Sequence, residues 1–159
     1  MDESKLQELA ARVEISENIG RFAQSADSRD WEGLASLFTE VVYLDYSSLT
    51  GQEPDRKGAR DLVEEWAAVL GNLDATQHFI GPPTVTIDGD EATAVAYFQA
   101  QHRLHNVTGG EKWTLGGRYD FAFELRGEDW KISGLRMTAM WGEGNQNIMA
   151  LAASRRRPS

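Results

Sequence analysis

The spacing of apolar residues changes once along this chain, near Gly71, and that change limits the fold more than any other feature. Before it, apolar residues recur at three- and four-residue steps, as at Ile15, Ile19 and Phe22, which is typical of amphipathic helices. After it, apolar and polar residues alternate, which is typical of half-buried strands. The alternating segments are residues 76–80, 84–88, 92–104, 112–126 and 130–141. Helices followed by long antiparallel strands predict an α+β fold with the helices on one face of the sheet.

The helical part of the chain also contains residues that mark where its elements begin and end. We expect the first helix to end near Asp27, and Ser28 to cap a short second helix. Residues 41–46 are β-branched and aromatic and predict a strand. Residues 47–58 contain glycine and proline and predict a long loop, and residues 62–70 predict a third helix.

The sheet is expected to bend strongly. Ser133-Gly134 interrupts the alternation of the last strand between Ile132 and Leu135, as a β-bulge does. A bent sheet with helices on its concave side encloses a pocket. We therefore predict a cone-shaped barrel built from a strongly curved, mixed but mainly antiparallel sheet, with the N-terminal helices packed on its concave face.

Chain length predicts one domain. A chain of 159 residues and 17.7 kDa is short of what two well-buried cores need. We assign residues 1–147 to this domain. Residues 148–159, which include three consecutive arginines, are expected to form a frayed and solvated tail.

Charge and composition exclude several function classes. A formal net charge of -9 repels phosphate backbones and anionic lipids, so we expect neither nucleic acid nor a membrane as partner. The absence of cysteine rules out disulfides, thiolate zinc sites and cysteine nucleophiles. The N-terminus lacks the apolar core of a secretory signal, and no run approaches the roughly 18 apolar residues of a membrane span. A cytoplasmic protein is the expectation.

The three histidines differ in strand parity. His78 shares a face with Ile80, and His102 shares one with Phe98, so both are predicted to point inward. His105 has the opposite parity and is expected on the surface. An inward imidazole is the best proton carrier near neutral pH, although a buried histidine is more often a satisfied core residue. Two inward histidines on separate strands favour a site.

Three further residues are candidates for chemistry. Asp27 lies where the apolar stripe of the first helix ends, so its carboxylate can reach the interior, although such a position is also typical of a plain helix-terminal aspartate. Paired with a histidine it would fix the ring tautomer and raise the basicity of the ring. Tyr46 and Tyr119 face inward by parity, either as carbonyl-polarising donors or as core tyrosines with one hydrogen bond.

Other catalytic motifs are missing from the sequence. It holds no G-x-S-x-G elbow, no P-loop and no dinucleotide fingerprint. A metal site built from His78, His102 and an acid would match no known ligand spacing. We expect neither a metal nor a cofactor.

Several segments also resemble a known family. They are Ala26-Asp27-Ser28-Arg29-Asp30-Trp31, Leu44-Asp45-Tyr46, Gln77-His78-Phe79-Ile80-Gly81, His102, Trp130-Lys131-Ile132-Ser133-Gly134-Leu135 and Met140-Trp141-Gly142-Glu143. In order and spacing they resemble scytalone dehydratase and the SnoaL-like branch of the nuclear transport factor 2-like superfamily, from roughly Ile15 to Asn145. The resemblance implies a cone-shaped α+β barrel with one deep, mostly apolar pocket.

The resemblance also implies roles for individual residues. In the dehydratase, an aspartate at the position of Asp27 pairs with a histidine at the position of His78. That histidine removes a proton next to a carbonyl and protonates the departing hydroxyl. A tyrosine at the position of Tyr46 helps to hold the water that polarises the carbonyl, and a second histidine falls at His102.

Two positions depart from the dehydratase pattern. Ala26 stands where the dehydratase has a second water-holding tyrosine, and the family's active-site asparagine falls at Tyr119 or Asp120. Carbonyl polarisation must then be rearranged, with Tyr119 as a candidate donor. Naphthol dehydration itself is therefore not the reaction we expect.

Together, these observations predict a cofactor-free lyase of the dehydratase type, or an isomerase, acting on an apolar cyclic or polyketide-like carbonyl compound. His78 would be the general base and then the acid, Asp27 its orienting partner, and Tyr46 with His102 or Tyr119 the donors to the developing enolate. Polyketide cyclisation or epoxide opening in the same pocket is an alternative, and so is a non-catalytic binding domain. A pocket filled by side chains, or Asp27 beyond hydrogen-bond reach of His78, would favour the binding domain.

The expected ligand is largely apolar with one or two oxygens. This expectation depends on the side chains predicted to line the pocket, which are Trp66, Phe79, Phe98, Met137 and Trp141 together with Tyr119.

The outer face of the sheet is predicted to pair with a copy of itself. It has few helices to cover it and is expected to expose large side chains, among them Tyr97 and Trp113. The resemblance suggests a trimer, and other branches of the superfamily suggest a dimer.

Overall fold

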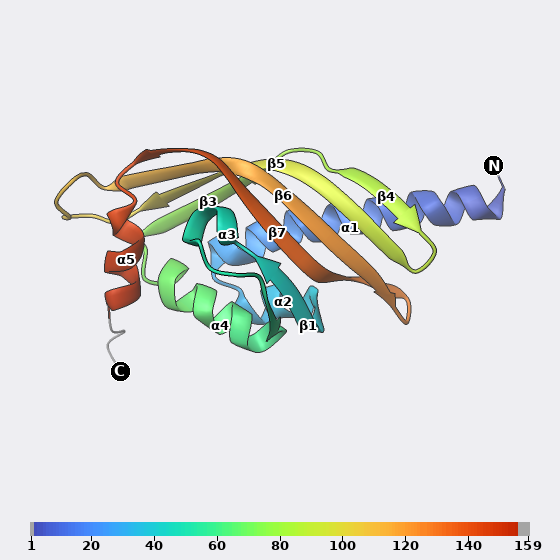
Figure 1. The fold of residues 1–159 in the computed structure, drawn as a ribbon. Coiled ribbons are helices and arrows are strands. Elements are labelled where there is room, and N and C mark those ends of the chain that lie inside the picture. Colours follow the sequence, from blue (N-terminus) through green and yellow to red (C-terminus); the bar gives the residue numbers. More distant parts are fainter. Residues whose placement is uncertain (1, 156–159) are drawn as a thin grey trace.

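A computed structural model describes residues 2–155 of the chain. Figure 1 shows a long helix and several short ones gathered against one strongly curved sheet. In chain order the elements are α1 (Glu3–Ser28), α2 (Trp31–Ser36), β1 (Phe38–Asp45), α3 (Ser47–Thr50), β2 (Asp55–Gly58), α4 (Ala59–Leu70), β3 (Ala75–Ile80), β4 (Thr84–Asp88), β5 (Glu91–Arg103), β6 (Lys112–Arg126), β7 (Asp129–Gly144) and α5 (Asn147–Ser154). None of these helices is long and apolar enough to cross a membrane.

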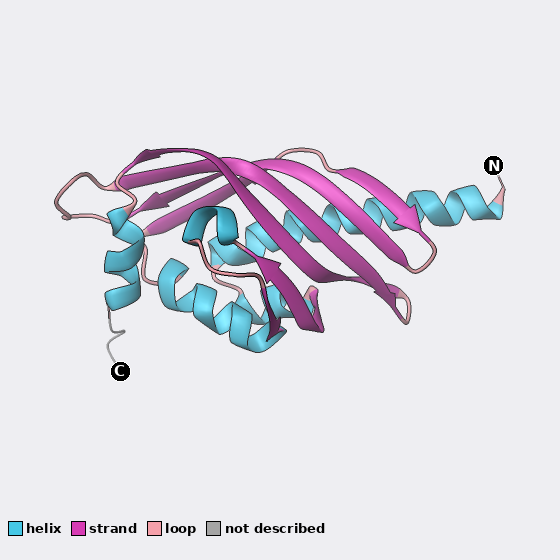
Figure 2. Cartoon of the chain, in the orientation of Figure 1, coloured by secondary structure: helices cyan, strands magenta, loops and turns pink. Residues whose placement is uncertain are grey.

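The sheet is mixed but mainly antiparallel, as predicted. Its strands follow the order β2-β1-β7-β6-β5-β3, and β4 also pairs with β5, which makes seven strands within residues 2–155. Only the β1–β7 pair among them is parallel. Figure 2 shows the long strands bending around the helices. The predicted fold class, an α+β cone with helices on the concave face, is confirmed.

Helix α1 supplies much of the core under the sheet. Its Phe22 ring makes edge contacts with Phe38, Trp66, Tyr119 and Phe121, at centroid separations of 5.5 to 6.3 Å. Edge-to-face pairs of this kind stabilise a core beyond the area they bury. Figure 1 shows α1 running behind the strands, so one long helix packs against several strands at once.

Strand β5 shows the period-two pattern most clearly. Its inward residues are at most 5% exposed and are mainly small: Ala92, Ala94, Ala96, Phe98, Ala100 and His102. The intervening residues are exposed. The inward orientation predicted for His102 is therefore confirmed.

The first two helices meet at a different residue from the one predicted. Ser28 is the last residue of α1, and Arg29 follows in the left-handed conformation at φ 60°. Asp30 caps α2 instead, because its carboxylate accepts a hydrogen bond from the Gly33 backbone at 2.9 Å.

The loop expected at residues 47–58 is partly structured. Its first residues form the single turn α3, and its last residues form β2, which pairs antiparallel with β1 from Val41↔Gly58 onward. This pairing satisfies backbone groups that the edge of β1 would otherwise leave open.

Two β-bulges shape the β6–β7 ladder. The register skips Ser133, between the pairs Phe123↔Ile132 and Ala122↔Gly134, which confirms the predicted bulge. A second bulge was not predicted: Gly117 pairs with Ala139 but Gly116 pairs with Trp141, so Met140 is the extra residue.

The second bulge corrects the prediction for Trp141. One extra residue reverses the alternation of β7 beyond it, and Trp141 therefore turns to the outer face, where it is 45% exposed. Its indole ring lies directly over Gly116. A Cβ on that glycine would come within 2.0 Å of the ring, so the indole occupies the space that a side chain would need. Trp141 does not line the internal pocket.

Two other aromatic assignments are also wrong. Phe79 alternates with His78 along β3, so it lies on the outer face and is 74% exposed instead of lining the pocket. Trp113 shares parity with Tyr119 along β6, so it points inward and is only 9% exposed, whereas we had placed it outside. Tyr97 does lie on the outer face, at 68% exposure.

The segment after residue 147 is more ordered than predicted. Residues Asn147–Ser154 form helix α5, whose Ile148 and Ala152 are fully buried, because their spacing of four places them on one helix face. The amide of Asn72 donates to the Ala152 carbonyl at 3.1 Å and holds α5 against α4. The expected fraying of residues 148–154 is therefore wrong, and the end of the predicted tail, residues 156–159, lies outside the described residues.

Candidate functional site

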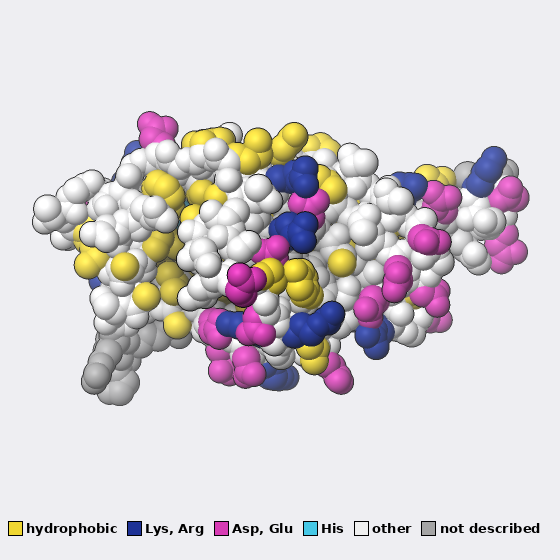
Figure 3. Space-filling view, viewed as in Figure 1, with side chains coloured by type: hydrophobic (Ala, Val, Ile, Leu, Met, Phe, Trp, Pro, Cys, Tyr) yellow, Lys and Arg dark blue, Asp and Glu magenta, His cyan; other side chains and the backbone are white. Residues whose placement is uncertain are grey.

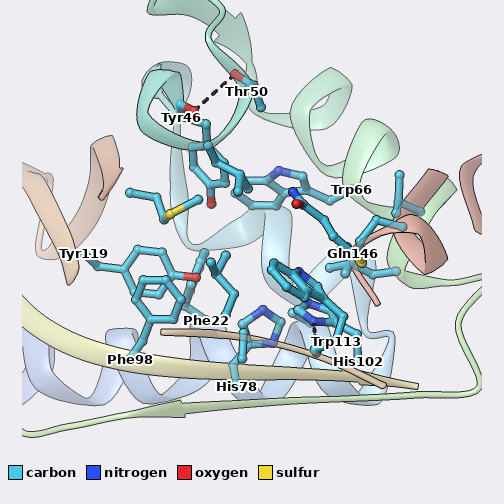
Figure 4. A pocket seen from close by; sticks show the side chains of 18 residues that line it. Phe22, Tyr46, Thr50, Trp66, His78, Phe98, His102, Trp113, Tyr119 and Gln146 are labelled. Carbon is cyan, nitrogen blue, oxygen red and sulfur yellow. Dashed lines mark hydrogen bonds between the residues drawn. The ribbon is translucent and has the colours of Figure 1, made fainter. Parts of the chain in front are cut away.

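An internal cavity of about 400 Å³ lies between the concave face of the sheet and the helices. Most of its wall is apolar, and Figure 4 shows the rings of His78, His102, Tyr46 and Tyr119 directed inward. The lining residues are Phe22, Ala26, Tyr46, Leu49, Thr50, Trp66, Val69, Leu70, His78, Phe98, Ala100, His102, Trp113, Leu115, Tyr119, Met137, Gln146 and Met149. Trp66, Phe98 and Met137 from the predicted lining are among them.

Asp27 and His78 form a close pair at the cavity wall. The Nδ1 atom of His78 lies 2.7 Å from Oδ1 of Asp27, and the backbone N–H of His78 donates to Oδ2 at 2.7 Å. The hydroxyl of Thr76 donates to Oδ1 at 3.1 Å. A carboxylate only accepts, so Nδ1 carries the hydrogen and Nε2 keeps its lone pair for the cavity. This is the tautomer that a general base requires.

The last turn of α1 and the strand β3 bring this pair together. Asp27 comes one residue before the helix ends, and its side chain is 21% exposed. His78 lies in the middle of β3, with its side chain 10% exposed. The contact joins positions 51 residues apart, which the strand parity of the sequence alone does not reveal.

His102 is held in a neutral form beside the pair. Its Nδ1–H donates to the Trp113 carbonyl at 3.0 Å, and its ring centroid lies 6.1 Å from that of His78. Burial lowers the pKa of His102 to about 4, with a smaller contribution from His78. At neutral pH its Nε2 is therefore an acceptor that carries no proton, which favours Tyr119 over His102 as the second donor.

Tyr46 and Tyr119 present two hydroxyl groups to the same part of the cavity (Figure 4). Burial raises the pKa of both hydroxyls above the ordinary tyrosine value. The neighbouring hydroxyl partly offsets this rise at Tyr46 and adds to it at Tyr119. Both therefore remain protonated donors. The Tyr119 ring stacks on Phe98 with a centroid distance of 4.1 Å and an interplanar angle of 19°, which fixes its direction.

Tyr119, and not its neighbour, belongs to the cavity. Asp120 accepts two hydrogen bonds from Arg118 at 3.0 and 3.2 Å on the opposite face of β6. Ala26 lines the cavity as well, so the space where the dehydratase pattern has a tyrosine is bordered here by a methyl group. A tyrosine from β6 is therefore the second phenol near the pair, and α1 supplies none at position 26.

Three short helices border the rest of the cavity. Leu49 and Thr50 come from α3, Trp66 from α4, and Met149 from α5, with Gln146 just before it. Figure 3 shows hydrophobic side chains gathered between α3 and α5. We missed the contributions of α3 and α5, since both are too short for a clear periodic signal.

One histidine lies away from the site, as expected. His105 has a half-exposed side chain, and its Nδ1 lies 3.0 Å from a carboxylate oxygen of Glu111 in the turn that follows β5. It does not line the cavity.

Comparison with known proteins identifies relatives of this chain. An uncharacterized protein of Mycobacterium tuberculosis is 31% identical over 88 residues, which cover 55% of this chain and 57% of that relative's length. The chain thus spans little more than half of this relative. Scytalone dehydratase of Pyricularia oryzae is 27% identical over 130 residues, covering 77% of this chain and 76% of the enzyme.

A solved structure and a family model also match this chain. The crystal structure of the Kfla4162 protein from Kribbella flavida superposes with a TM-score of 0.82 at 31% identity, over 87% of this chain and 96% of that one. A family model for the SnoaL-like domain matches residues 7–136, which include the Asp27–His78 pair and both cavity tyrosines. This chain belongs to the SnoaL-like domain family.

Proposed function

We propose that this protein is a lyase of the dehydratase type, or an isomerase, that acts on a neutral, apolar carbonyl compound by general acid–base catalysis. The observation that carries the proposal is the Asp27–His78 pair, 2.7 Å apart, at the wall of a cavity that also receives two phenol hydroxyls. A base and a donor pair in one apolar space are what enolisation of a ketone needs.

His78 would move the proton. Its Nε2 takes a hydrogen from the carbon next to the carbonyl, the electron pair of that C–H bond forms the enolate, and the ring becomes an imidazolium. The Asp27 carboxylate stabilises this cation through Nδ1–H. In a dehydratase, His78 then returns the proton to the departing hydroxyl, the C–O bond breaks and water leaves. In an isomerase, the proton returns to another carbon.

Tyr46 and Tyr119 would hold the carbonyl oxygen. Both hydroxyls stay protonated, so both can donate to the oxygen as negative charge develops on it. In a space with little water such donors are worth more than in solution, and one of them commonly contributes roughly 10²–10³-fold in rate. From the sequence alone, His102 and Tyr119 are alternatives for the second donor to the carbonyl oxygen. This assignment gives that role to Tyr119.

The chemistry of the wall supports a neutral ligand. None of the lining residues within residues 2–155 is a lysine, an arginine or a carboxylate, so a charged substrate would find no counter-ion there. The polar groups that are available suit one or two oxygens on an otherwise apolar skeleton.

Two features favour catalysis over simple binding. A binding domain has no need of a carboxylate that orients an imidazole, and here the carboxylate accepts both the ring and the backbone N–H of His78. The cavity also remains open at about 400 Å³ and is not filled by side chains.

Hydrogen exchange tests the proton transfer without knowledge of the natural substrate. β-Tetralone is neutral, bicyclic and acidic next to its carbonyl, and its incorporation of deuterium from D₂O can be followed by NMR. We expect the protein to accelerate this exchange and His78→Ala to slow it by roughly 10²–10⁴-fold. His105→Ala is the matched control, because it removes a histidine outside the cavity, and it should exchange like the wild type.

A second assay separates lyase from isomerase. β-Hydroxycyclohexanone gives conjugated cyclohexenone by loss of water, whereas β,γ-cyclohexenone gives the same product by a proton shift. Turnover of the first alone assigns a lyase and turnover of the second alone an isomerase. If β-tetralone and a panel of apolar cyclic ketones show no accelerated exchange, or if His78→Ala exchanges as fast as the wild type, the proposed function is wrong.

A further inference from the structure

Asp45 is a buried carboxylate beside the site that does not line the cavity. It directly precedes Tyr46 and is 7% exposed. Its Oδ1 accepts from the backbone N–H and the hydroxyl of Ser47, at 3.1 and 2.6 Å, and its Oδ2 accepts from Nε of Arg136 at 2.9 Å. The carboxylate therefore joins the residue after Tyr46 to the neighbouring strand β7.

The bond to Ser47 encloses Tyr46. An aspartate that accepts from the N–H two residues ahead forms an Asx-turn, and Tyr46 is the residue inside this turn. The Tyr46 backbone lies at φ −112° and ψ 21°, between strand and helix values, at the junction of β1 and α3. The direction in which its side chain leaves the backbone is thus set by the turn.

The turn is anchored to the sheet on its other side. Asp45 and Arg136 are partners in the parallel β1–β7 register, so the ion pair extends an existing ladder. Ser47 lowers the pKa of Asp45 through its hydroxyl and its backbone N–H, and Arg136 acts in the same direction. The carboxylate is therefore ionised at neutral pH, and its charge-assisted hydrogen bonds hold the turn.

A separate contact holds α3 in place without Asp45. The hydroxyl of Ser48 donates to the Met137 carbonyl and accepts from the Ala139 backbone N–H, both at 2.9 Å. Loss of the Asp45 carboxylate would therefore leave α3 attached to β7. What it would release is the orientation of Tyr46.

We propose that Asp45, held by Arg136, is a positioning residue that directs the Tyr46 hydroxyl toward the ligand oxygen beside Tyr119. This inference rests on the proposed function in one respect, namely that Tyr46 is a donor to that oxygen. It goes beyond it by assigning a role in the site to a residue that lies outside the cavity.

Binding of para-nitrophenolate tests the inference. It is an apolar ring with a visible absorbance, and its one anionic oxygen resembles the enolate oxygen that Tyr46 and Tyr119 would hold beside the protonated His78 ring. Tyr46→Phe should weaken binding by about 10–100-fold, the range for a hydrogen bond to a charged group.

Asp45→Asn keeps an oxygen that can accept from Ser47 but removes the charge and the acceptor for Arg136. It should weaken binding by about 3–30-fold, within the range for coupled neighbours. In the Tyr46→Phe background, Asp45→Asn should have no further effect, because the hydroxyl it positions is already absent.

Asp120→Asn is the matched control. Asp120 also pairs with an arginine of the outer face, Arg118, but does not touch Tyr46. Its loss should leave para-nitrophenolate binding unchanged. Circular dichroism melts show whether each variant folds. If Asp45→Asn does not, Arg136→Gln replaces it, since that change removes the same ion pair to β7 and should weaken binding in the same way.

The outcomes separate this inference from the proposed function. The inference is overturned if the effects of Asp45→Asn and Tyr46→Phe multiply, if Asp120→Asn loses as much as Asp45→Asn, or if the wild type does not bind para-nitrophenolate. β-Tetralone exchange decides the proposed function independently. Coupled binding losses without any ketone exchange would leave the positioning role standing and remove the enzymatic one.

Discussion

Replacing Asp27 by asparagine keeps the shape of the side chain and removes its charge. The carboxylate accepts from the His78 ring and the His78 backbone, each at 2.7 Å, and from the Thr76 hydroxyl at 3.1 Å. An amide has only one accepting oxygen. Whichever way it is turned, either the ring or the backbone N–H of His78 therefore faces an NH₂ group.

The two orientations of the amide have different costs. If the NH₂ group faces the ring, Nδ1 must accept, the hydrogen moves to Nε2, and His78 is no longer a base, which costs roughly 10²–10⁴-fold in rate. If the NH₂ group faces the backbone, a part-buried donor loses its acceptor, which costs about 1–3 kcal/mol of unfolding free energy. For a chain of this size that loss lowers the melting temperature by about 2–12 °C.

Exchange of β-tetralone and thermal melts measure both costs on the same protein. Thr76→Val removes only the longest of the three hydrogen bonds, so it should change the exchange rate by less than about 5-fold, equivalent to the roughly 1 kcal/mol of one hydrogen bond. Asp27→Asn combined with His78→Ala should exchange no more slowly than His78→Ala alone, because the pair acts as a unit. Wild-type exchange and wild-type melting in Asp27→Asn would refute the reasoning.

Three further predictions concern stability, assembly and ligand charge. Because burial lowers the pKa of His102 from 6.5 to about 4, the unfolded chain binds more protons between these pH values, so acidification from pH 6.5 to 4 should remove up to about 3 kcal/mol of unfolding free energy. Urea unfolding should show this loss in the wild type and a flatter profile in His102→Gln; equal slopes would contradict it. The exposed outer-face rings of Phe79 and Tyr97 should make the protein a homo-oligomer, and Tyr97→Lys should dissociate it. A light-scattering mass near 17.7 kDa for the wild type at micromolar concentration would rule this out. Calorimetry should find that apolar ketones bind and sugar phosphates do not, and the reverse preference would contradict the neutral site.

The strand pattern predicted most of the site, because period-two alternation determines which face a residue occupies. His78, His102 and Tyr119 all lie where parity places them. The same rule also places Phe79 outside and Trp113 inside, and our assignments for these two were wrong because they followed residue type in place of parity. Parity does not predict distances between elements. The contact of α1 with β3 that joins Asp27 to His78 could therefore not be read from local spacing.

The remaining errors came from features with weak local signals. The bulge at Ser133 contains a Ser-Gly step that marks it in the sequence, whereas the bulge at Met140 lies among large residues and is marked only by the glycines at positions 116 and 117 of the partner strand. Parity therefore failed at Trp141. Helix α5 has only two fully buried positions, Ile148 and Ala152, which is too few for a periodic pattern to separate it from a tail.

The Asp27 carboxylate has a consequence for the solubility of the fold. Strand β3 is the last strand in the sheet order, and such a strand offers unpaired N–H groups on which another chain can assemble. The outward N–H of His78, in the middle of β3, is already taken by Asp27. The carboxylate that orients the ring therefore also occupies a donor on which strand addition would depend, so a variant at position 27 should be checked for aggregation before a loss of activity is attributed to chemistry.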